Sequence, residues 1–356
     1  MKTGIKILLS ILLALVLVVS GYVAYAFIAY ERLPDHMTLE VSPSAGQAQP
    51  LSPGTSLRLL SYNVGFGAYS DDYSFFMDGG KESRARSQEA VYENIGGAAA
   101  VIREQAPDLI LVQEVDFDST RSLHVDQRQL LQDALPEYSH SFAQNYDSPY
   151  LFWPLLSPHG ANKSGILAFS RYPISSATRR SLPIEDGFMK MVDLDRCYSV
   201  SRIPVSNGHK LVLYNVHLSA YTSDGLIANE QLVMLFDDML SEYAAGNYVI
   251  AGGDFNKDLL GDSSSVFGVA PEGATWAQPF PQDMIPQELR LIAPFDAASP
   301  AASCRNADRP YGPDSFRVTV DGFLVSQNIE VTQSQVVETG YRWSDHNPVS
   351  LDFTLK

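Results

Sequence analysis

The segment DLILVQEVD, residues 108–116, is a continuous apolar run that ends in polar residues. Such a run predicts a strand that is covered on both faces, with polar side chains at its end. The preceding stretch places Val91, Ile95 and Ala98 on one face of a helical pattern, and Pro107 marks the end of that helix. The order is therefore a helix that leads directly into a buried strand.

A second unit of this kind follows later in the chain. Leu232, Leu235 and Phe236 belong to a helical pattern, Gly246 is expected at its C-cap, and the next strand is NYVIAGGDFN at 247–256. Other apolar runs with strand character are LRLLSYNVGF at 57–66, KSGILAFSRYPI at 163–174, KLVLYNVHLSAY at 210–221, FRVTVDGFLVS at 316–326 and NPVSLDFTLK at 347–356. Strands outnumber helices, which predicts layered mixed sheets with helices outside.

The N-terminus carries an uncharged apolar segment at residues 7–30, long enough to span a bilayer at about 1.5 Å per residue. We interpret residues 1–30 as a transmembrane anchor, with a cleaved signal peptide as the alternative because Lys2 and Lys6 form a basic n-region. Both interpretations place the rest of the chain outside the cytoplasm, either on a single-pass membrane protein or secreted after cleavage.

Composition limits what the remaining chain can be. The 356 residues are 45% apolar and 19% charged, which excludes a disordered protein. The formal net charge of −16 argues against a broad basic surface for nucleic acid. Residues 31–56 have the Pro, Ser and Gly content of a linker or stalk, so we expect one catalytic domain at 57–356. Cys197 and Cys304 are too few for a thiolate zinc site; they are two buried thiols or one bridge.

Polar residues follow several of the predicted strands, where an apolar residue is otherwise expected. They are Asn63, Glu114, Asn215, His217, Asp254, Asn256, Asp321, Asp345 and His346. Any one of them alone has an ordinary structural explanation, but solvated strand ends do not need to select oxygen ligands and imidazoles so consistently. Carboxylate and amide oxygens suit Mg²⁺, Mn²⁺ or Ca²⁺, and two histidines beside carboxylates are able to bind phosphate and carry protons.

These residues lie in motifs that resemble the endonuclease/exonuclease/phosphatase superfamily, the group of DNase I, exonuclease III-like repair enzymes, bacterial sphingomyelinases and inositol polyphosphate 5-phosphatases. The motifs are SYNV at 61–64, LVQEV at 111–115, NVHL at 215–218, GGDFN at 252–256, VDGFLVS at 320–326 and SDHNPV at 344–349. The resemblance implies a four-layered α/β sandwich of the DNase I-like kind and a divalent-metal-dependent phosphoester hydrolase. The metal it implies is Mg²⁺, with Mn²⁺ and Ca²⁺ as alternatives.

The resemblance also implies a role for each residue at the strand ends. Glu114 would be the principal metal ligand, with Asn63 beside it and Asp345 as a further carboxylate ligand. In catalysis, Asp254 would position or deprotonate the attacking water and Asn256 would orient it. The remaining implied roles are His346 as a phosphate contact held by Asp321, His217 as general acid or phosphate binder, and Asn215 as a phosphate contact.

The expected reaction is hydrolysis of a phosphodiester in nucleic acid or in a phospholipid headgroup. His217 favours the DNase-like or sphingomyelinase-like branches, because the repair endonucleases that the chain resembles usually have a tyrosine there. The membrane is expected as a partner through the N-terminal segment, and no obligate protein partner is inferred. The alternative is a non-catalytic extracellular binding module on the same fold. The apolar stretch at 147–156 is interpreted as a core strand or substrate wall. The alternative interpretation of this stretch is a loop that touches the membrane.

Overall fold

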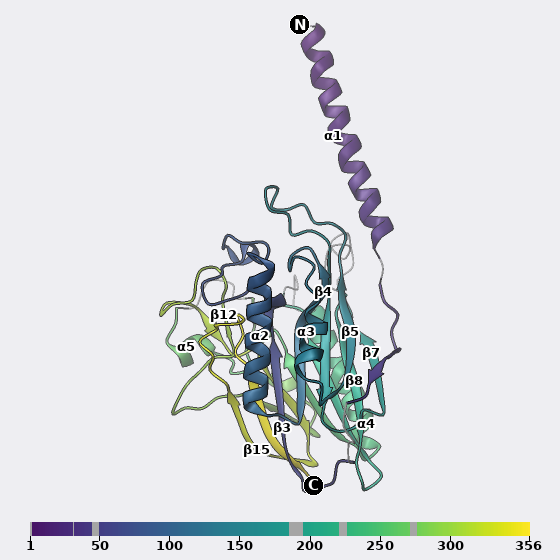
Figure 1. The fold of residues 1–356 in the computed structure, drawn as a ribbon, viewed down its shortest axis with the longest axis vertical. Helices are drawn as coiled ribbons and strands as arrows, with labels where there is room; N and C mark the ends of the chain where they lie inside the picture. Colours follow the sequence, from purple (N-terminus) through teal and green to yellow (C-terminus); the bar gives the residue numbers. More distant parts are fainter. Residues whose placement is uncertain (1, 31, 45–49, 185–194, 221–225, 271–275) are drawn as a thin grey trace.

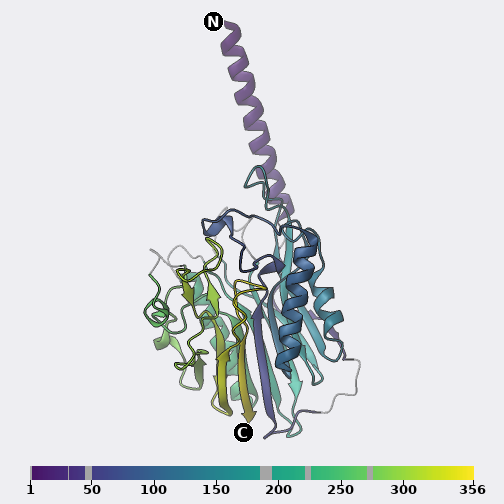
Figure 2. The same ribbon diagram turned by 60° about the vertical axis from the view of Figure 1, so that its left-hand side comes forward.

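A computed structural model describes residues 2–30, 32–44, 50–184, 195–220, 226–270 and 276–356 (Figure 1). Its helices are α1 (Lys2–Ala29), α2 (Gln88–Gln105), α3 (Gln127–Ala134), α4 (Leu226–Ala244) and α5 (Ser263–Phe267), with 3-10 turns η1 (Gly65–Gly67), η2 (Phe76–Asp78) and η4 (Gln282–Met284). The helix α1 extends away from the body of the molecule (Figures 1 and 2). The segment Thr3–Ala29 is long and apolar enough to cross a membrane, and a signal sequence has the same length and composition.

Two seven-stranded sheets form the centre of the molecule. The first has the order β1 (Met37–Leu39), β7 (Ser176–Ser181), β8 (Cys197–Pro204), β9 (Lys210–His217), β10 (Tyr248–Asp254), β14 (Asp321–Ser326) and β11 (Leu289–Ile292). The second has the order β15 (Ile329–Val336), β16 (Val349–Leu355), β3 (Ser56–Asn63), β4 (Leu109–Ser119), β6 (Asn162–Ser170), β5 (Ser139–Asp147) and β2 (Val41–Ser42). A separate short pair is β12 (Cys304–Arg305) and β13 (Arg317–Val318).

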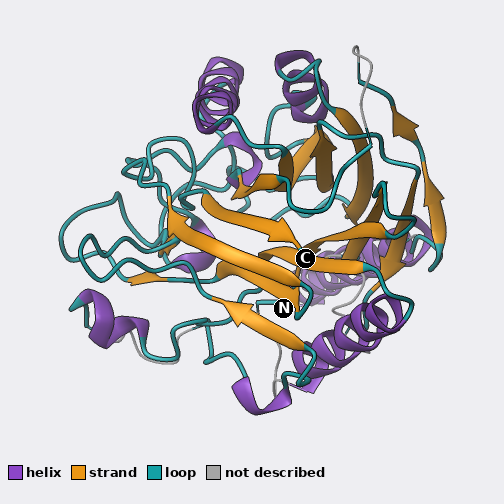
Figure 3. Ribbon diagram, turned by 90° about the horizontal axis from the view of Figure 1, so that it is seen from below, coloured by secondary structure: helices purple, strands orange, loops and turns teal. Residues whose placement is uncertain are grey.

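Alternation along the strands builds four layers. In β3, Leu57 and Leu59 face the core between the two sheets, whereas Leu60 and Tyr62 face a second core that includes Val91 of α2. The other sheet packs its outer face on α4 in the same way. Helices therefore lie on both outer faces of the stacked sheets, as Figure 3 shows from below, and the predicted four-layered sandwich is confirmed.

The lead-in expected as a linker contributes two short strands. Residues 37–39 pair with β7 at the edge of one sheet, and residues 41–42 pair with β5 at the edge of the other. Strands of two or three residues are too short to produce a periodic pattern, and they exist because an edge of each sheet accepts them. The expected linker is therefore partly structured and contacts both sheets.

The interpretation of residues 147–156 as a core strand is wrong. The segment belongs to the loop between β5 and β6, and Trp153, Leu155 and Leu156 in it are exposed by 65%, 73% and 101%. The composition of the segment is that of a core strand, but composition does not show whether the fold buries an apolar run or leaves it exposed. Cys197 and Cys304 are both free and buried.

Candidate functional site

Sheet register brings three of the predicted residues into one row. β10 runs parallel to β9 and antiparallel to β14, so that Asp254 lies opposite His217 on one side and Asp321 on the other. Gly253, next in the chain, has φ +144, and a Cβ there would lie 2.0 Å from the carbonyl oxygen of Val216. The glycines of GGDFN therefore allow the close strand approach that sets this row.

The second sheet supplies the metal-ligand candidates from the same end of the sandwich. Asn63 ends β3, and β4 beside it carries Glu114 at a bulge where the register against β6 shifts. Glu114 has φ +56, an unusual conformation for a non-glycine residue. Asn63 is fully buried and donates through Nδ2 to Glu114 Oε1 (3.2 Å) and Asp254 Oδ2 (3.1 Å), which joins the two sheets.

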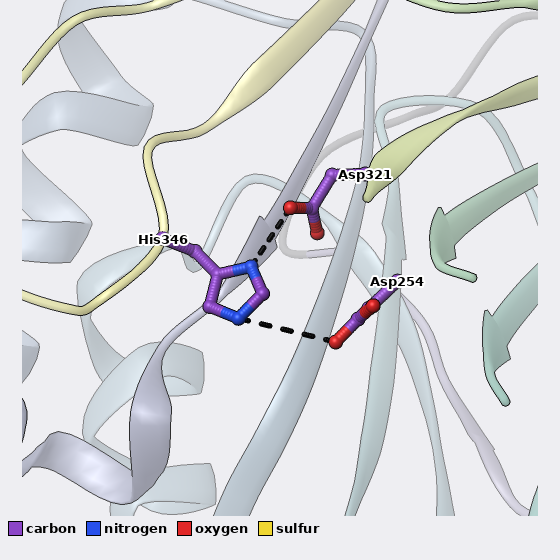
Figure 4. A group of neighbouring side chains, drawn as sticks. All are labelled: Asp254, Asp321 and His346. Atoms are coloured by element: carbon purple, nitrogen blue, oxygen red, sulfur yellow. Dashed lines mark hydrogen bonds and ion pairs between the residues drawn. The ribbon is translucent and has the colours of Figure 1, made fainter. Parts of the chain in front are cut away.

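His346 and Asp321 form a buried hydrogen-bonded pair (Figure 4). His346 Nδ1 lies 2.7 Å from Asp321 Oδ2, and the opposite ring nitrogen, Nε2, lies 3.9 Å from Asp254 Oδ2. Burial alone would keep this imidazole neutral, but the Asp321 carboxylate outweighs burial and raises the pKa of His346 well above its usual value. Asp321 therefore favours the charged form of His346, whose Nε2 lies 3.5 Å from Cys304 Sγ and 3.9 Å from Asp254 Oδ2.

The pKa of His217 is shifted in the opposite direction. Burial, with a further contribution from Arg196 and His346, holds the pKa of His217 well below its usual value. Its Nε2 lies 3.7 Å from Asp254 Oδ2 and 3.9 Å from Glu114 Oε1. These separations are too long for hydrogen bonds, so His217 Nε2 makes no direct hydrogen bond to either carboxylate.

Carboxylates crowd this end of the sandwich. Burial raises the pKa of Asp254 to about 7, with a further contribution from Asp321 and Glu114. Burial likewise raises the pKa of Asp345 to about 6, and Glu114 again contributes. A divalent cation between these oxygens would offset the repulsion, so the donor set fits a hard metal ion. Asp254, Asp321 and His346 also have potential ligand atoms within 4.8 Å of one another.

The side-chain amides of Asn63 and Asn215 already have hydrogen-bond partners. Asn63 Oδ1 accepts a hydrogen bond from Gly65 N (3.0 Å), so that metal coordination through this oxygen requires the amide to turn over. Asn215 lies in the core between the sheets, where it accepts from Gln113 and donates to the carbonyls of Val112 and Leu167. The structure does not bring Asn215 to the site, whereas the other predicted residues lie together.

Asn256 supports Asp254 directly. Its backbone N donates to Asp254 Oδ1 (2.8 Å), and its side-chain Nδ2 donates to Leu218 O (2.8 Å). Like Glu114, it has a positive φ, of +50. Glu114 lies at the bulge within β4 and Asn256 lies just beyond the end of β10, and such unusual backbone conformations are typical of functional sites.

Three further residues that the sequence motifs did not reveal lie near the site residues. Cys304 Sγ lies 3.5 Å from His346 Nε2, and its strand bridges to His346. Arg121 forms a buried ion pair with Asp116 (2.8 Å) and helps to lower the pKa of His217. Lys257, next to Asn256, is 5% exposed, and burial lowers its pKa. Of these three, only Lys257 could have been found from the sequence, because it directly follows the GGDFN motif.

Comparison with known proteins relates this geometry to one family. A sequence model of the Endonuclease/Exonuclease/phosphatase family matches residues 60–346. A comparison with curated protein sequences finds no match. One similar solved structure is an endonuclease/exonuclease/phosphatase from Beutenbergia cavernae DSM 12333, which is 21% identical with a TM-score of 0.58, over 84% of this chain and 72% of that one.

Two other similar structures bear names that state what they bind or do. D. rerio TDP2, complexed with single-strand DNA product, is 14% identical with a TM-score of 0.53, over 84% of this chain and 99% of that one. ANGEL2, a 2',3'-cyclic phosphatase in complex with adenosine-2',3'-vanadate, is 14% identical with a TM-score of 0.55, over 90% of this chain and 99% of that one. At these identities the likeness establishes the fold.

Proposed function

This chain belongs to the Endonuclease/Exonuclease/phosphatase family, and on that premise we propose that it is a divalent-metal-dependent phosphodiesterase. The observation that carries the proposal is the arrangement around Asp254 Oδ2, which two imidazole nitrogens approach to 3.7 and 3.9 Å. A protonated and a neutral imidazole on one side of a carboxylate supply the donors and the acceptor that phosphodiester hydrolysis needs.

Asn63, Glu114 and Asp345 are the residues that would hold the metal ion. Mg²⁺ is the first candidate and Mn²⁺ or Ca²⁺ the alternatives, since the donors are carboxylate and amide oxygens. When bound, the cation supplies Lewis-acid polarisation of a phosphate oxygen and offsets negative charge in the transition state.

The acidic and basic roles follow from the two protonation states. His346, held as imidazolium by Asp321, donates from Nε2 to a non-bridging phosphate oxygen. Asp254 accepts a proton from the attacking water, and its pKa of about 7 suits a general base near neutral pH. Asn256 keeps the Asp254 carboxylate in position through its backbone N–H.

His217 binds the phosphate as a neutral donor in this proposal. Its Nε2 lies 3.7 Å from Asp254 Oδ2 and 3.9 Å from Glu114 Oε1, beyond hydrogen-bond distance of both. In the part of the chain that the structure describes, His217 Nδ1 is buried without a hydrogen-bond partner. The lowered pKa of His217 favours phosphate binding over the general-acid role that was its alternative.

The substrate class that we propose is a phosphodiester of nucleic acid or of a phospholipid headgroup. TDP2 with its DNA product supports the first, and the candidate membrane span supports the second. The domain is proposed to lie outside the cytoplasm, because Lys2 and Lys6 precede the apolar segment and basic residues are retained inside. Asn215 is proposed to hold the sheets together beneath the site.

The test is turnover by the full chain in detergent of bis(p-nitrophenyl) phosphate, plasmid DNA, sphingomyelin and p-nitrophenyl phosphate, with each cation and with a chelator. His346→Ala and Asp254→Ala are each expected to lower the rate by about 10²- to 10⁴-fold without loss of folding. His209→Ala is the matched control, since His209 is exposed in the β8–β9 turn. Wild-type rates in either site variant, or turnover that survives the chelator, contradict the proposal.

A further inference from the structure

The loop between β5 and β6, residues 148–161, is an apolar projection from an acidic protein. Its sequence, SPYLFWPLLSPHGA, contains no Asp, Glu, Lys or Arg, although the chain has 41 acidic residues. The exposed large apolar residues in it are Tyr150, Phe152, Trp153, Leu155 and Leu156, with 39%, 43%, 65%, 73% and 101% exposure. An uncharged patch of this kind on a soluble surface marks an interaction site.

The base of this loop is fixed to the body of the protein. Leu151 and Gly160 exchange backbone hydrogen bonds of 3.0 and 2.9 Å. His159 Nδ1 lies 2.7 Å from Ser83 O, and Ser83 Oγ donates to Ser157 O. These contacts hold the base of the loop against the body, and the side chains of Phe152, Trp153, Leu155 and Leu156 beyond it are exposed.

The loop also contacts the candidate membrane helix. The rings of Tyr22 and Phe152 are 4.1 Å apart, and Tyr25 Oη accepts a hydrogen bond from the backbone N of Tyr150 (3.0 Å). At 1.5 Å per residue, Tyr22 lies about 10 Å before the end of α1 at Ala29. A bilayer core takes about 20 residues, so a span counted from Ile7 ends near Ala26 and places Tyr22, with the loop beside it, within about 6 Å of the outer polar–apolar interface, where Trp and Tyr are preferred.

The same end of the sandwich carries the candidate active site. β4 runs parallel to β3, and β6 runs antiparallel to β4, so the start of β6 lies at the end of the sheet where Asn63 and Glu114 are found. The loop precedes β6 and projects from this end toward α1 (Figures 1 and 2). A membrane at the loop would therefore face the catalytic residues.

We propose that the tip of the β5–β6 loop, residues 152–156, inserts into the outer interface of the bilayer that α1 spans and holds the catalytic end of the domain toward the lipid headgroups. The partner of the tip is a lipid surface, because the tip is uncharged and rich in aromatic and leucine side chains. Transfer of such side chains out of water is favourable in free energy and needs no charged partner. The insertion of the tip does not depend on the proposed function. The orientation of a phosphodiesterase toward the headgroups rests on the proposed function.

A label on the tip tests insertion without any measurement of activity. Leu156→Cys, in the full chain reconstituted in phosphatidylcholine vesicles, is labelled with an environment-sensitive fluorophore; Cys197 and Cys304 are buried and do not compete for the label. Glu330→Cys is the control, since Glu330 is exposed in β15 beside the C-terminal end of β16. Spin-labelled lipid is expected to quench the label at 156 several-fold more than the label at 330.

Two outcomes overturn insertion. Equal quenching of both labels by aqueous iodide places the tip in water. Protection of the label at 156 from both iodide and spin-labelled lipid places the tip against protein, either α1 or another chain.

The orientation has its own test in the double variant Leu155→Ser/Leu156→Ser. We expect an unchanged rate on soluble bis(p-nitrophenyl) phosphate and a rate on phospholipid vesicles that falls at least about tenfold. An unchanged vesicle rate overturns the orientation. If the wild type hydrolyses no diester at all, the proposed function fails, while the fluorescence experiment still decides whether the loop inserts.

Discussion

Asp321 is the residue whose effect on chemistry is clearest, because it contacts His346 Nδ1 and supports the charged imidazole. Asp321→Asn removes the negative charge, so the pKa of His346 falls and the imidazole loses its proton at a lower pH than in the wild type. We expect kcat to fall by about 10²-fold or more and the alkaline limb of the kcat–pH profile to move to lower pH. Kinetics across pH 6–10 measure both effects.

Asp352→Asn is the control for this prediction, since Asp352 pairs with Arg58 on the surface of the second sheet. A lower kcat with an unmoved alkaline limb would show that Asp321 only supports the fold around His346. A variant with wild-type kcat would remove Asp321 from the mechanism.

Gly253 is a second residue with a measurable role. A Cβ at this position would meet the Val216 carbonyl at 2.0 Å in addition to adopting a positive φ. Gly253→Ala is expected to lower the free energy of unfolding by at least about 3 kcal/mol, the sum of backbone strain and overpacking. Gly208→Ala is the matched control, because Gly208 has φ +89 and open space around it, and it should cost about 1 kcal/mol. Urea unfolding of both variants checks the difference.

At the scale of elements, the β5–β6 loop is attached to the body through a histidine that titrates. Burial lowers the pKa of His159 to about 4, so the unfolded chain binds a proton at His159 between pH 6.5 and 4 that the folded chain does not. The contribution of His159 to stability is therefore present above pH 6.5 and decreases as the pH falls, by up to about 3 kcal/mol.

His159→Phe isolates this contribution, because the ring keeps its neighbours Phe66, Phe75 and Phe76 and loses the titration. The free energy of unfolding between pH 7 and 4.5 should fall less in the variant than in the wild type. Asp254 and Asp345 titrate in the same range but are common to both proteins, so they cancel in the difference. Parallel pH dependences would show that His159 is accessible to protons in the folded protein.

At the scale of the whole molecule, metal binding is expected to stabilise the entire domain, because the proposed ligands Asn63, Glu114 and Asp345 come together only in the folded chain. Asn63 and Glu114 come from one sheet and Asp254 from the other, and their side chains meet between the two. A cation at a concentration 100-fold above its Kd raises the free energy of unfolding by about 2.7 kcal/mol. Thermal unfolding with added Mg²⁺, Mn²⁺ or Ca²⁺ measures the rise in Tm.

Glu114→Gln is expected to abolish the metal-dependent rise in Tm, whereas Glu330→Gln, an exposed substitution on β15, should keep it. A full rise in Glu114→Gln would place the metal elsewhere, for instance at Asp254, Asp321 and His346. The readout does not depend on turnover, so it tests the metal site separately from the reaction.

The sequence by itself determined the apolar N-terminal segment, the helix–strand units and the polar residues at the strand ends, because each is a local pattern of spacing and residue type. GGDFN and SDHNPV in their order were enough to indicate the family. These local patterns can be recognised without knowing which strands are neighbours in the sheets.

Only the tertiary structure decided which of these residues meet. The register of β9, β10 and β14 brings His217, Asp254 and Asp321 into one row, while Asn215, two residues before His217, lies in the core instead. Strand pairing depends on contacts between segments far apart in the chain, and so do the opposite pKa shifts of His217 and His346. The exposure of the β5–β6 loop was hidden for the same reason: an apolar run has the same composition whether the fold buries it or projects it from the surface.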